Sequence, residues 1–445
     1  MDATIFYTIF PLNSDIKHTQ MNPTRKRIAV IGSGISGLAS AYFLSREHDV
    51  VLFEAGNYLG GHTNTVDVSL DGVTHPVDTG FLVYNQATYP NLIALFAELG
   101  VTSYDTDMSF GVSMDNGQLE WAGTNVDSVF AQRSNAFSPA FLAMLRDILR
   151  FNKAAPDYLE QSLINGATLG QLLHKEKYGA TFCDAYLLPM AAAIWSSSPS
   201  DILKYPASSF IRFCLNHSLL QVNNRPQWKT VLGGAREYVK KIAATLADVR
   251  LNTPIVSVMR TPGGVQVVTA NKTESFDEVV FATHAPETAK LLTDASGHER
   301  EILTAVRYQN NLAYLHTDNS LLPRLQKVWS SWNYIGSQKV NGQRPVCVSY
   351  LLNKLQKLPF STPVVVTLNP YDPPDPSTVL GQFTYQHPVF DKAAISAQNK
   401  LATIQGKNRC WFAGAWTGYG FHEDGLKSAL RVAIYFGLQP SWASL

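Results

Sequence analysis

The sequence predicts an α/β protein in which a domain built on a parallel sheet is interleaved with a second, α+β domain. Two observations support this prediction. Residues 28–54 have the pattern of a strand, a glycine-rich turn, a helix, a second strand and an acidic residue. Buried-strand patterns return at residues 276–283 and 410–414, after stretches of helices and hairpins that indicate an inserted domain.

The first unit has the glycine spacing of a dinucleotide-binding motif. Gly32 permits a tight turn, Gly34 lets the backbone approach a pyrophosphate, and Gly37 lets the helix lie close to the sheet. Ser36 lies in the same turn, where the helix N-terminus offers free N–H groups to phosphate. Glu54, 22 residues after Gly32, is placed for a ribose hydroxyl. An acid there would repel a 2′-phosphate, so the motif favours FAD or NAD over NADP.

The same apolar stretch, residues 28–44, has an alternative interpretation as a membrane span, because it follows the basic residues 25–27. Its 17 residues are fewer than the roughly 20 that cross a bilayer core. Its glycines and serines also stand where the nucleotide turn needs them. The flanking strands and the spacing of Glu54 therefore favour nucleotide binding.

Composition predicts a largely buried, cytoplasmic protein of two domains. Charged residues make up 16% of the 445 residues, below the roughly 25% of an average domain. The 36 basic and 35 acidic residues give a net charge of +1, which argues against nucleic acid as a partner. The four cysteines lack metal-ligand spacing, so we expect reduced thiols and no metal site. Residues 1–24 lack a basic start and a cleavage site, which predicts a loose N-terminal extension.

Further elements follow in chain order. We assign residues 25–100, 221–304 and 406–445 to the nucleotide-binding domain, and residues 101–220 and 305–405 to the second domain. Hairpins are expected around residues 71–72, 116–117 and 262–264, helices over 89–99, 141–152, 207–219, 235–246 and 425–436, and strands at 249–252, 276–283, 345–350, 364–368 and 410–414.

Four sequence blocks occur in a fixed order. They are the glycine turn continued from Glu54 to Gly60-Gly61-His62-Thr63; Asp78-Thr79-Gly80-Phe81; Gly233-Gly234 with residues 251–255; and Phe412-Ala413-Gly414 with residues 420–426. Between Arg27 and Gly437 these blocks resemble the superfamily of FAD-dependent amine oxidases and phytoene desaturases. The resemblance implies a Rossmann-like FAD-binding domain interleaved with a substrate domain. It also implies noncovalent FAD, since no cysteine stands in the pattern used for covalent attachment.

The resemblance assigns cofactor contacts residue by residue. It implies that Gly61, His62 and Thr63 lie near the pyrophosphate, that Gly80 passes close to the flavin, and that Ile255 pairs its backbone with adenine. The last block places Gly414, Asp424, Gly425 and Leu426 around the flavin. A glycine at a helix start lets N–H groups face flavin N1 and the C2 carbonyl, where negative charge appears on reduction.

Two departures from the superfamily pattern bear on the substrate. His62 stands where arginine is usual, which removes a fixed charge but keeps a donor. His422 occupies the position of an aromatic residue that helps to cage the amine in monoamine oxidases. A histidine does not give the same electron-rich cage, so an amine substrate is disfavoured.

A narrower resemblance concerns Gly-Phe-His-Glu-Asp-Gly at 420–425, with residues 225–230 and 385–388. These are similar to a bacterial branch of oxidases associated with cyclopropane fatty acid synthase-like methyltransferases, including desaturases of methyl-branched acyl chains. The resemblance implies a long lipid acyl chain as substrate and oxidation of a C–H bond to C=C. It also implies a lipid methyltransferase as a candidate partner and a peripheral contact at the inner membrane surface.

His422 and Glu423 are the candidate catalytic pair, since a histidine exchanges a proton near neutral pH. The alternative is that both only shape the loop. Other residues are weaker candidates, and each of them has a structural alternative as a loop, surface or core residue. Near the reaction or the nucleotide they are His387 and Tyr385 in the substrate domain, His284 near the nucleotide, and Lys229 for oxygen chemistry. The others are Trp195, Trp228, Trp329 and Trp332, which could line an apolar cavity, and Arg146, Arg150 and Lys153, which could contact lipid headgroups.

Three functions stay open on the sequence alone. An FAD-dependent acyl desaturase or oxidase is favoured, with hydride passing from a substrate C–H bond to flavin N5. An amine oxidase is the second enzyme to consider. A flavoprotein that binds a lipid methyltransferase without turnover of its own is the third. An NAD dehydrogenase is disfavoured, because a second nucleotide turn for NAD is absent from the sequence.

Overall fold

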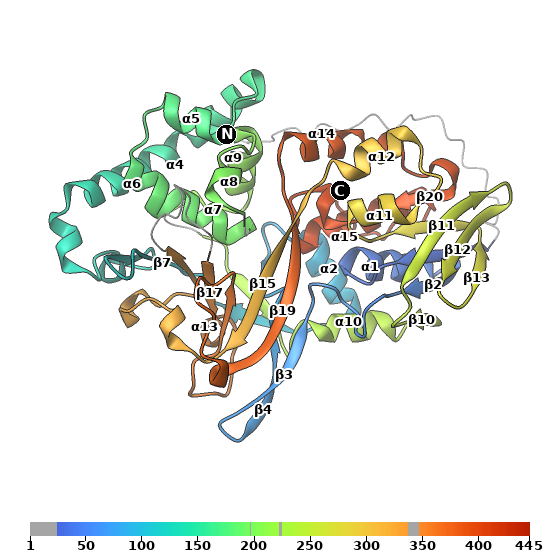
Figure 1. The fold of residues 1–445 in the computed structure, drawn as a ribbon, viewed down its shortest axis with the longest axis horizontal. Helices are drawn as coiled ribbons and strands as arrows, with labels where there is room; N and C mark the ends of the chain where they lie inside the picture. The colour runs from blue at the N-terminus through green and yellow to red at the C-terminus, as the bar shows by residue number, and fades with distance from the viewer. Residues whose placement is uncertain (1–24, 196, 222–224, 337–346) are drawn as a thin grey trace.

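The computed structural model describes residues 25–195, 197–221, 225–336 and 347–445. The extension expected over residues 1–24 lies outside the described residues. Two sheets dominate these ranges. In Figure 1 the long strands β15 (Tyr308–His316) and β19 (Val379–Pro388), which belong to one of the sheets, lie between the rest of that sheet and the other sheet.

The first sheet is parallel and carries the glycine turn. Its strand order within the described residues is β10-β2-β1-β14-β20, and each neighbouring pair is parallel. The bounds are β1 Arg27–Ile31, β2 Asp49–Phe53, β10 Asp248–Arg250, β14 Glu278–Phe281 and β20 Cys410–Phe412. β1, β2 and β14 are almost wholly buried, which explains their continuous apolar sequence.

Both faces of this sheet are covered. One face shares a core with α1 (Ile35–Leu44), α2 (Pro90–Leu99), α10 (Arg236–Ala243) and α15 (His422–Tyr435). The other face packs on the antiparallel strands β11 (Ile255–Thr261), β12 (Gly264–Thr269) and β13 (Thr273–Phe276), and on α11 (Ala285–Leu291), α12 (Gly297–Thr304) and α14 (Lys392–Lys400). The expected Rossmann-like α/β layering is therefore confirmed.

The second sheet combines two segments that are distant in sequence. Its order is β19-β15-β18-β17-β16-β7-β8, and parallel pairing of β7 with β16 joins the segments. The bounds are β7 Phe110–Met114, β8 Leu119–Ala122, β15 Tyr308–His316, β16 Trp332–Gly336, β17 Cys347–Leu351, β18 Val365–Leu368 and β19 Val379–Pro388.

Helices pack against this second sheet in one large core. They are α3 Val126–Val129, α4 Pro139–Asn165, α5 Leu169–Lys175, α6 Ala180–Phe182, α7 Leu188–Trp195, α8 Pro199–Ile202, α9 Ala207–Asn216 and α13 Leu352–Leu355. The hairpin β3 (Thr65–Leu70) and β4 (Val73–Asp78) and the small sheet of β5 (Tyr84–Asn85), β9 (Trp228–Val231) and β6 (Ser103–Thr106) complete the strands. This two-domain fold agrees with the expected class.

Some elements differ from the predicted bounds. α4 is longer than the expected helix over 141–152: Ser138 caps its start, and it continues through the exposed Pro156 to Gly166, whose left-handed conformation ends it. α9 ends at Asn216 rather than 219. α15 begins at His422 rather than Gly425. The strand expected at 345–350 is observed from Cys347, and residues 345–346 lie outside the described ranges.

Asp78, at the end of β4, is a buried carboxyl that caps α10. Both its oxygens accept a hydrogen bond from the amide of Ala235, at 2.9 and 3.0 Å, and the Thr65 hydroxyl donates to Oδ1 at 2.5 Å. Burial raises the pKa of Asp78 from 3.8 to about 6. Because the folded-state pKa lies above the unfolded one, this group stabilises the fold most below pH 3.8. That contribution is lost as the pH rises through about 6.

We therefore expect Asp78→Asn to weaken the pH dependence of stability. Between about pH 4 and pH 7 the wild-type Tm should fall more steeply with pH than the Tm of the variant, as followed by differential scanning fluorimetry. Asp67→Asn is the matched control, because Asp67 is exposed and its bond to Arg236 lowers its pKa out of this window. Equal slopes for wild type and Asp78→Asn would contradict the expectation.

Candidate functional site

A cavity of about 680 Å³ lies between the two sheets. At one end it is lined by the glycine turn after β1, by Glu54 and by Ile255. At the other end it is lined by aromatic and aliphatic side chains of α7, α9 and the second sheet. This size and this mixture of apolar walls with a few polar groups are typical of a cofactor and substrate site.

The glycine turn has the geometry of a phosphate-binding loop. Gly32 has a φ of +98°, which disfavours any side chain. A Cβ on Gly37 would lie 1.8 Å from the carbonyl oxygen of Gly32, so the helix can approach only with glycine there. A Cβ on Gly34 would meet nothing within 4 Å, which leaves open cavity in front of its backbone. The first-turn amides of α1 have no intrahelical acceptor and point to this end of the cavity.

Glu54 is held on the cavity wall by the glycine turn and by its own loop. Its Oε2 accepts hydrogen bonds from the amide and hydroxyl of Ser33, at 2.9 and 2.5 Å, and Oε1 accepts one from the amide of Gly56 at 2.7 Å. These bonds orient the carboxylate and leave it on the cavity wall. Its position remains compatible with the ribose contact that the sequence predicts.

The predicted cofactor residues fall into two groups. The cavity is lined by Gly32, Gly34, Ser36, Glu54, Gly61, His62, Gly80, Ile255 and Gly414. Five others do not line it: Gly37, Thr63, Asp424, Gly425 and Leu426. Gly425 has a packing role, since a Cβ there would lie 2.7 Å from Cγ2 of Ile35, so glycine lets α15 approach α1. Asp424 accepts a hydrogen bond from the amide of Phe421 at 3.0 Å.

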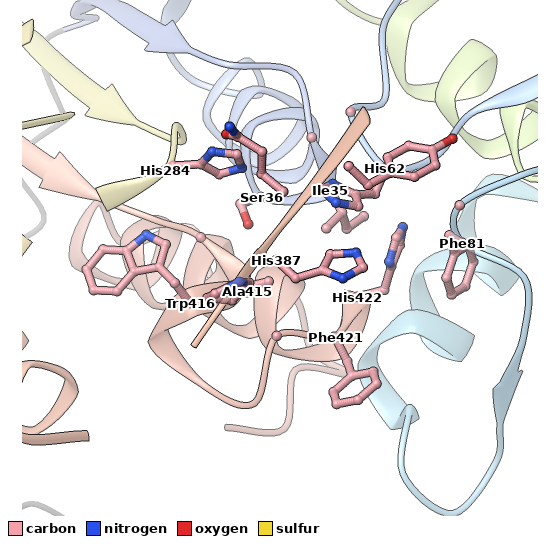
Figure 2. A pocket seen from close by; sticks show the side chains of 18 of the residues that line it. Ile35, Ser36, His62, Phe81, His284, His387, Ala415, Trp416, Phe421 and His422 are labelled. Carbon is pink, nitrogen blue, oxygen red and sulfur yellow. The ribbon is translucent and has the colours of Figure 1, made fainter. Parts of the chain in front are cut away.

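Four histidines, His62, His284, His387 and His422, line the cavity (Figure 2). Burial lowers the pKa of His422 to about 3 and that of His387 to about 4. Burial also holds the pKa of His62 well below its usual range. These three rings are therefore neutral at physiological pH, and the cavity gains polarity from them without positive charge.

His422 is the first residue of α15 and is held on two sides. Its ring stacks on Phe81, with centroids 3.7 Å apart and an interplanar angle of 19° (Figure 2). Its Nε2 lies 2.9 Å from the Thr63 hydroxyl and 3.3 Å from the Tyr238 hydroxyl. Both hydroxyls lie behind the cavity wall, so they position the ring from outside the cavity.

Glu423 occupies a different place from the one expected of a catalytic residue. The residue is 5% exposed and does not line the cavity. Oε1 accepts hydrogen bonds from the backbone and side-chain nitrogens of Asn91, and Oε2 accepts one from the amide of Leu92 at 3.0 Å. Glu423 therefore caps the N-terminus of α2, which corrects its assignment to the catalytic pair.

Tyr385 and His387 both line the cavity, from β19. The Tyr385 hydroxyl is held by Asn64 Nδ2 at 3.0 Å and Thr79 Oγ1 at 2.8 Å. His284 also lines it and stacks on Tyr308 with centroids 4.2 Å apart. The polar groups of the substrate domain thus reach the cofactor end of the cavity.

The remaining candidates divide between cavity and surface. Trp195, Trp228 and Trp332 line the cavity, whereas Trp329 lies elsewhere and donates to the carbonyl of Pro323 at 2.7 Å. Lys229 does not line the cavity and pairs with Asp105 at 2.6 Å. Arg146, Arg150 and Lys153 are on the exposed side of α4, where Arg150 lies 3.8 Å from the ring centre of Tyr178.

Sequence reasoning missed an aromatic group at the wall. Phe213 on α9 and His217, the residue that follows α9, stack with centroids 3.9 Å apart, and Phe213 also stacks on Phe421 at 5.1 Å. Their i, i+4 spacing places both on one helix face, which is the signal that could have identified them. Tyr238 on α10 gave no such signal, because only the tertiary fold brings it to His422.

Comparison with known proteins agrees with this geometry. The sequence model of the flavin-containing amine oxidoreductases matches residues 35–434. The chain belongs to this family. It is accordingly an FAD-dependent oxidoreductase. A search of curated protein sequences finds no significant match. Within the described residues, no helix is both long and apolar enough to cross a membrane.

Solved structures with the same fold act on different compounds. A CLA-producing fatty acid isomerase from P. acnes is 14% identical, with a TM-score of 0.66 over 92% of this chain and 98% of its own. Putrescine oxidase bound to putrescine is 14% identical, with a TM-score of 0.64 over 93% and 99%. Cyclohexylamine oxidase from Brevibacterium oxydans IH-35A is 15% identical, with a TM-score of 0.63 over 93% and 100%.

The residues present fit FAD. The open space in front of Gly34, the free amides of α1 and the carboxylate of Glu54 suit a diphosphate and its ribose. The start of α15 gives the cavity a second positive helix end. None of the four cysteines lines the cavity, in agreement with noncovalent binding.

Proposed function

We propose that the chain oxidises a saturated C–H/C–H pair of a long-chain fatty acyl group, methyl-branched or held in a phospholipid, to a C=C bond. Bound FAD supplies the two-electron acceptor, which takes up the hydride from one carbon. The neighbouring carbon loses a proton to a base, for which the neutral ring of His387 on the cavity wall is the candidate. The residues of the chain hold the acyl chain against the cofactor and exclude water from it.

The apolar far end of the cavity carries this proposal. Side chains there are almost all hydrocarbon or aromatic: Met108, Ile194, Trp195, Phe213, Leu219, Trp228, Trp332, Tyr350 and Leu368. Charged side chains among the described lining residues are Glu54, Glu287 and Lys290, and all three belong to the nucleotide-binding end. A hydrocarbon chain is stabilised by such walls, whereas a buried ammonium needs a carboxylate or an electron-rich cage.

The histidines on the cavity wall favour the same substrate class. A neutral imidazole at His422 replaces the aromatic residue that helps to cage an amine in relatives. No carboxylate among the described residues of the apolar end compensates for that change. The fold itself does not distinguish an acyl substrate from an amine substrate, since the similar structures include a fatty acid isomerase and two amine oxidases.

Anaerobic reduction of the bound cofactor tests the proposal. The purified yellow protein is mixed without oxygen with oleic acid, with vesicles of bacterial phospholipid, or with putrescine and cyclohexylamine. We expect bleaching of the flavin absorbance by one acyl source, with product lighter by two hydrogens in mass spectrometry. Reduction by the amines alone would support the amine oxidase alternative and overturn the proposal. Full FAD loading without reduction by any of them would support a partner of a lipid methyltransferase.

A substitution in the apolar end sharpens this test. Ile194 lies on the wall, so Ile194→Asp places a carboxylate where the acyl chain is expected. We expect at least about a tenfold loss of kcat/KM for the acyl substrate, equivalent to ~1.4 kcal/mol, with FAD content unchanged. Leu142→Asp on the exposed side of α4 is the control and should retain wild-type turnover. Equal turnover of both variants would place the substrate elsewhere.

A further inference from the structure

The tautomer of His422 follows from a buried triangle of polar atoms. The Thr63 hydroxyl and the Tyr238 hydroxyl are 2.5 Å apart, and both lie within hydrogen-bond distance of His422 Nε2. Within the described residues, neither hydroxyl has another hydrogen-bond partner. Tyr238 is fully buried, and burial raises its pKa, so the phenol keeps its proton and must donate it within the triangle.

Counting hydrogens decides which ring nitrogen carries the proton. If Nε2 is unprotonated, Tyr238 donates to Thr63, Thr63 donates to Nε2, and every hydroxyl hydrogen is used. If Nε2 carries the proton, the triangle holds three hydrogens: one on Nε2, one on Tyr238 and one on Thr63. Nε2 then accepts no hydrogen bond, so the Tyr238 hydroxyl can donate only to Thr63. The Thr63 hydroxyl has no acceptor left. One buried donor would remain unpaired, at a cost of about 1–3 kcal/mol.

The other ring nitrogen is turned toward the cavity. The two nitrogens of an imidazole point in nearly opposite directions, and Nε2 is directed at Thr63 and Tyr238 behind the wall. The ring itself lines the cavity, and stacking on Phe81 fixes its plane. No hydrogen bond to Nδ1 is formed within the described residues.

We propose that Thr63 and Tyr238 are positioning residues that hold His422 as the Nδ1–H tautomer, so that it presents a hydrogen-bond donor, and not a base, to the cavity. A neutral donor stabilises negative charge that develops on an acceptor during reduction. The acceptor is an electronegative atom of the flavin ring or of the substrate. This inference replaces the proton-exchanging role that the sequence analysis gave to His422, and it does not depend on the acyl substrate.

Nuclear magnetic resonance of the holoenzyme tests the tautomer directly. With ¹⁵N-labelled histidine, a protonated Nδ1 and an unprotonated Nε2 are expected for the His422 ring, whose signals are identified by their loss in His422→Gln. Thr63→Val removes one hydroxyl and Tyr238→Phe the other. We expect the double variant to lose the single tautomer. Thr74→Val, on the exposed hairpin, is the matched control and should leave the signals unchanged.

The tautomer assignment would be overturned by a protonated Nε2 in the wild type, or by an unchanged tautomer in the double variant that is still folded and yellow. The Nδ1–H proton signal then locates the acceptor. A downfield shift on reduction with dithionite places the acceptor on the cofactor. A shift only on addition of oleic acid places it on the substrate. No shift in either case would show that Nδ1–H is not a donor.

Discussion

Substitution of Gly34 by alanine is expected to abolish tight FAD binding without unfolding the protein. The structure leaves open cavity where a Cβ of Gly34 would lie, and the backbone there has an ordinary φ of −60°. The methyl group would therefore occupy space that the motif reserves for close approach of a diphosphate. We expect at least a tenfold rise in the Kd for FAD, about 1.4 kcal/mol, measured by quenching of flavin fluorescence.

Gly37→Ala in the same turn separates binding from folding. Its Cβ would clash with the backbone of Gly32. We therefore expect the free energy of unfolding, measured by urea titration, to fall by at least about 3 kcal/mol. Gly263→Ala, at the tip of the β11–β12 turn, has free space and should change neither property. Wild-type FAD affinity in Gly34→Ala would exclude the glycine turn as the diphosphate site.

Substitution of Glu423 by alanine is expected to destabilise the protein while sparing catalysis. The carboxylate satisfies the first amides of α2 and the side chain of Asn91, all of them buried. Removal leaves these donors unpaired and takes a negative charge from a helix N-terminus. We expect a loss of about 3 kcal/mol in the free energy of unfolding, measured by urea denaturation with fluorescence detection.

Turnover per bound flavin distinguishes this capping role from a catalytic one. We expect kcat, normalised to FAD content, to stay within about twofold of wild type, because Glu423 does not line the cavity. Glu160→Ala, on the exposed surface of α4, controls for loss of an acidic residue. A fall in normalised kcat beyond about a hundredfold, with wild-type stability, would restore Glu423 to the reaction.

The glycine turn could be predicted because its geometry is local. Gly32 needs a positive φ of +98°, and a Cβ on Gly37 would meet the carbonyl oxygen of Gly32, so the spacing of the two glycines alone indicates the turn. The buried strand β14 could also be predicted from the sequence, because a strand covered on both faces has an unbroken apolar sequence. Pairing of Phe110 with Trp332 across the second sheet is nonlocal, and the sequence carried no signal for it.

The catalytic pair shows where sequence reasoning fails. His422 and Glu423 look like a polar pair when they lie in a loop, but α15 already begins at His422. Successive residues of a helix point about 100° apart, so the two side chains face different surroundings. His422 reaches the cavity and Glu423 reaches α2. Tyr238, which the fold brings to His422, could not be found by spacing, since no local pattern links the two.

The order of the first sheet has a consequence for biosynthesis. β1 lies at the centre of the sheet and is synthesised early. β20, which is separated from β1 by β14, and the helix α15, which packs on α1, lie near the C-terminal end, within residues 410–435. A nascent chain on the ribosome therefore has the glycine turn long before the opposite cavity wall exists. Flavin capture must await the emergence of that late segment, and truncated translation products should remain colourless.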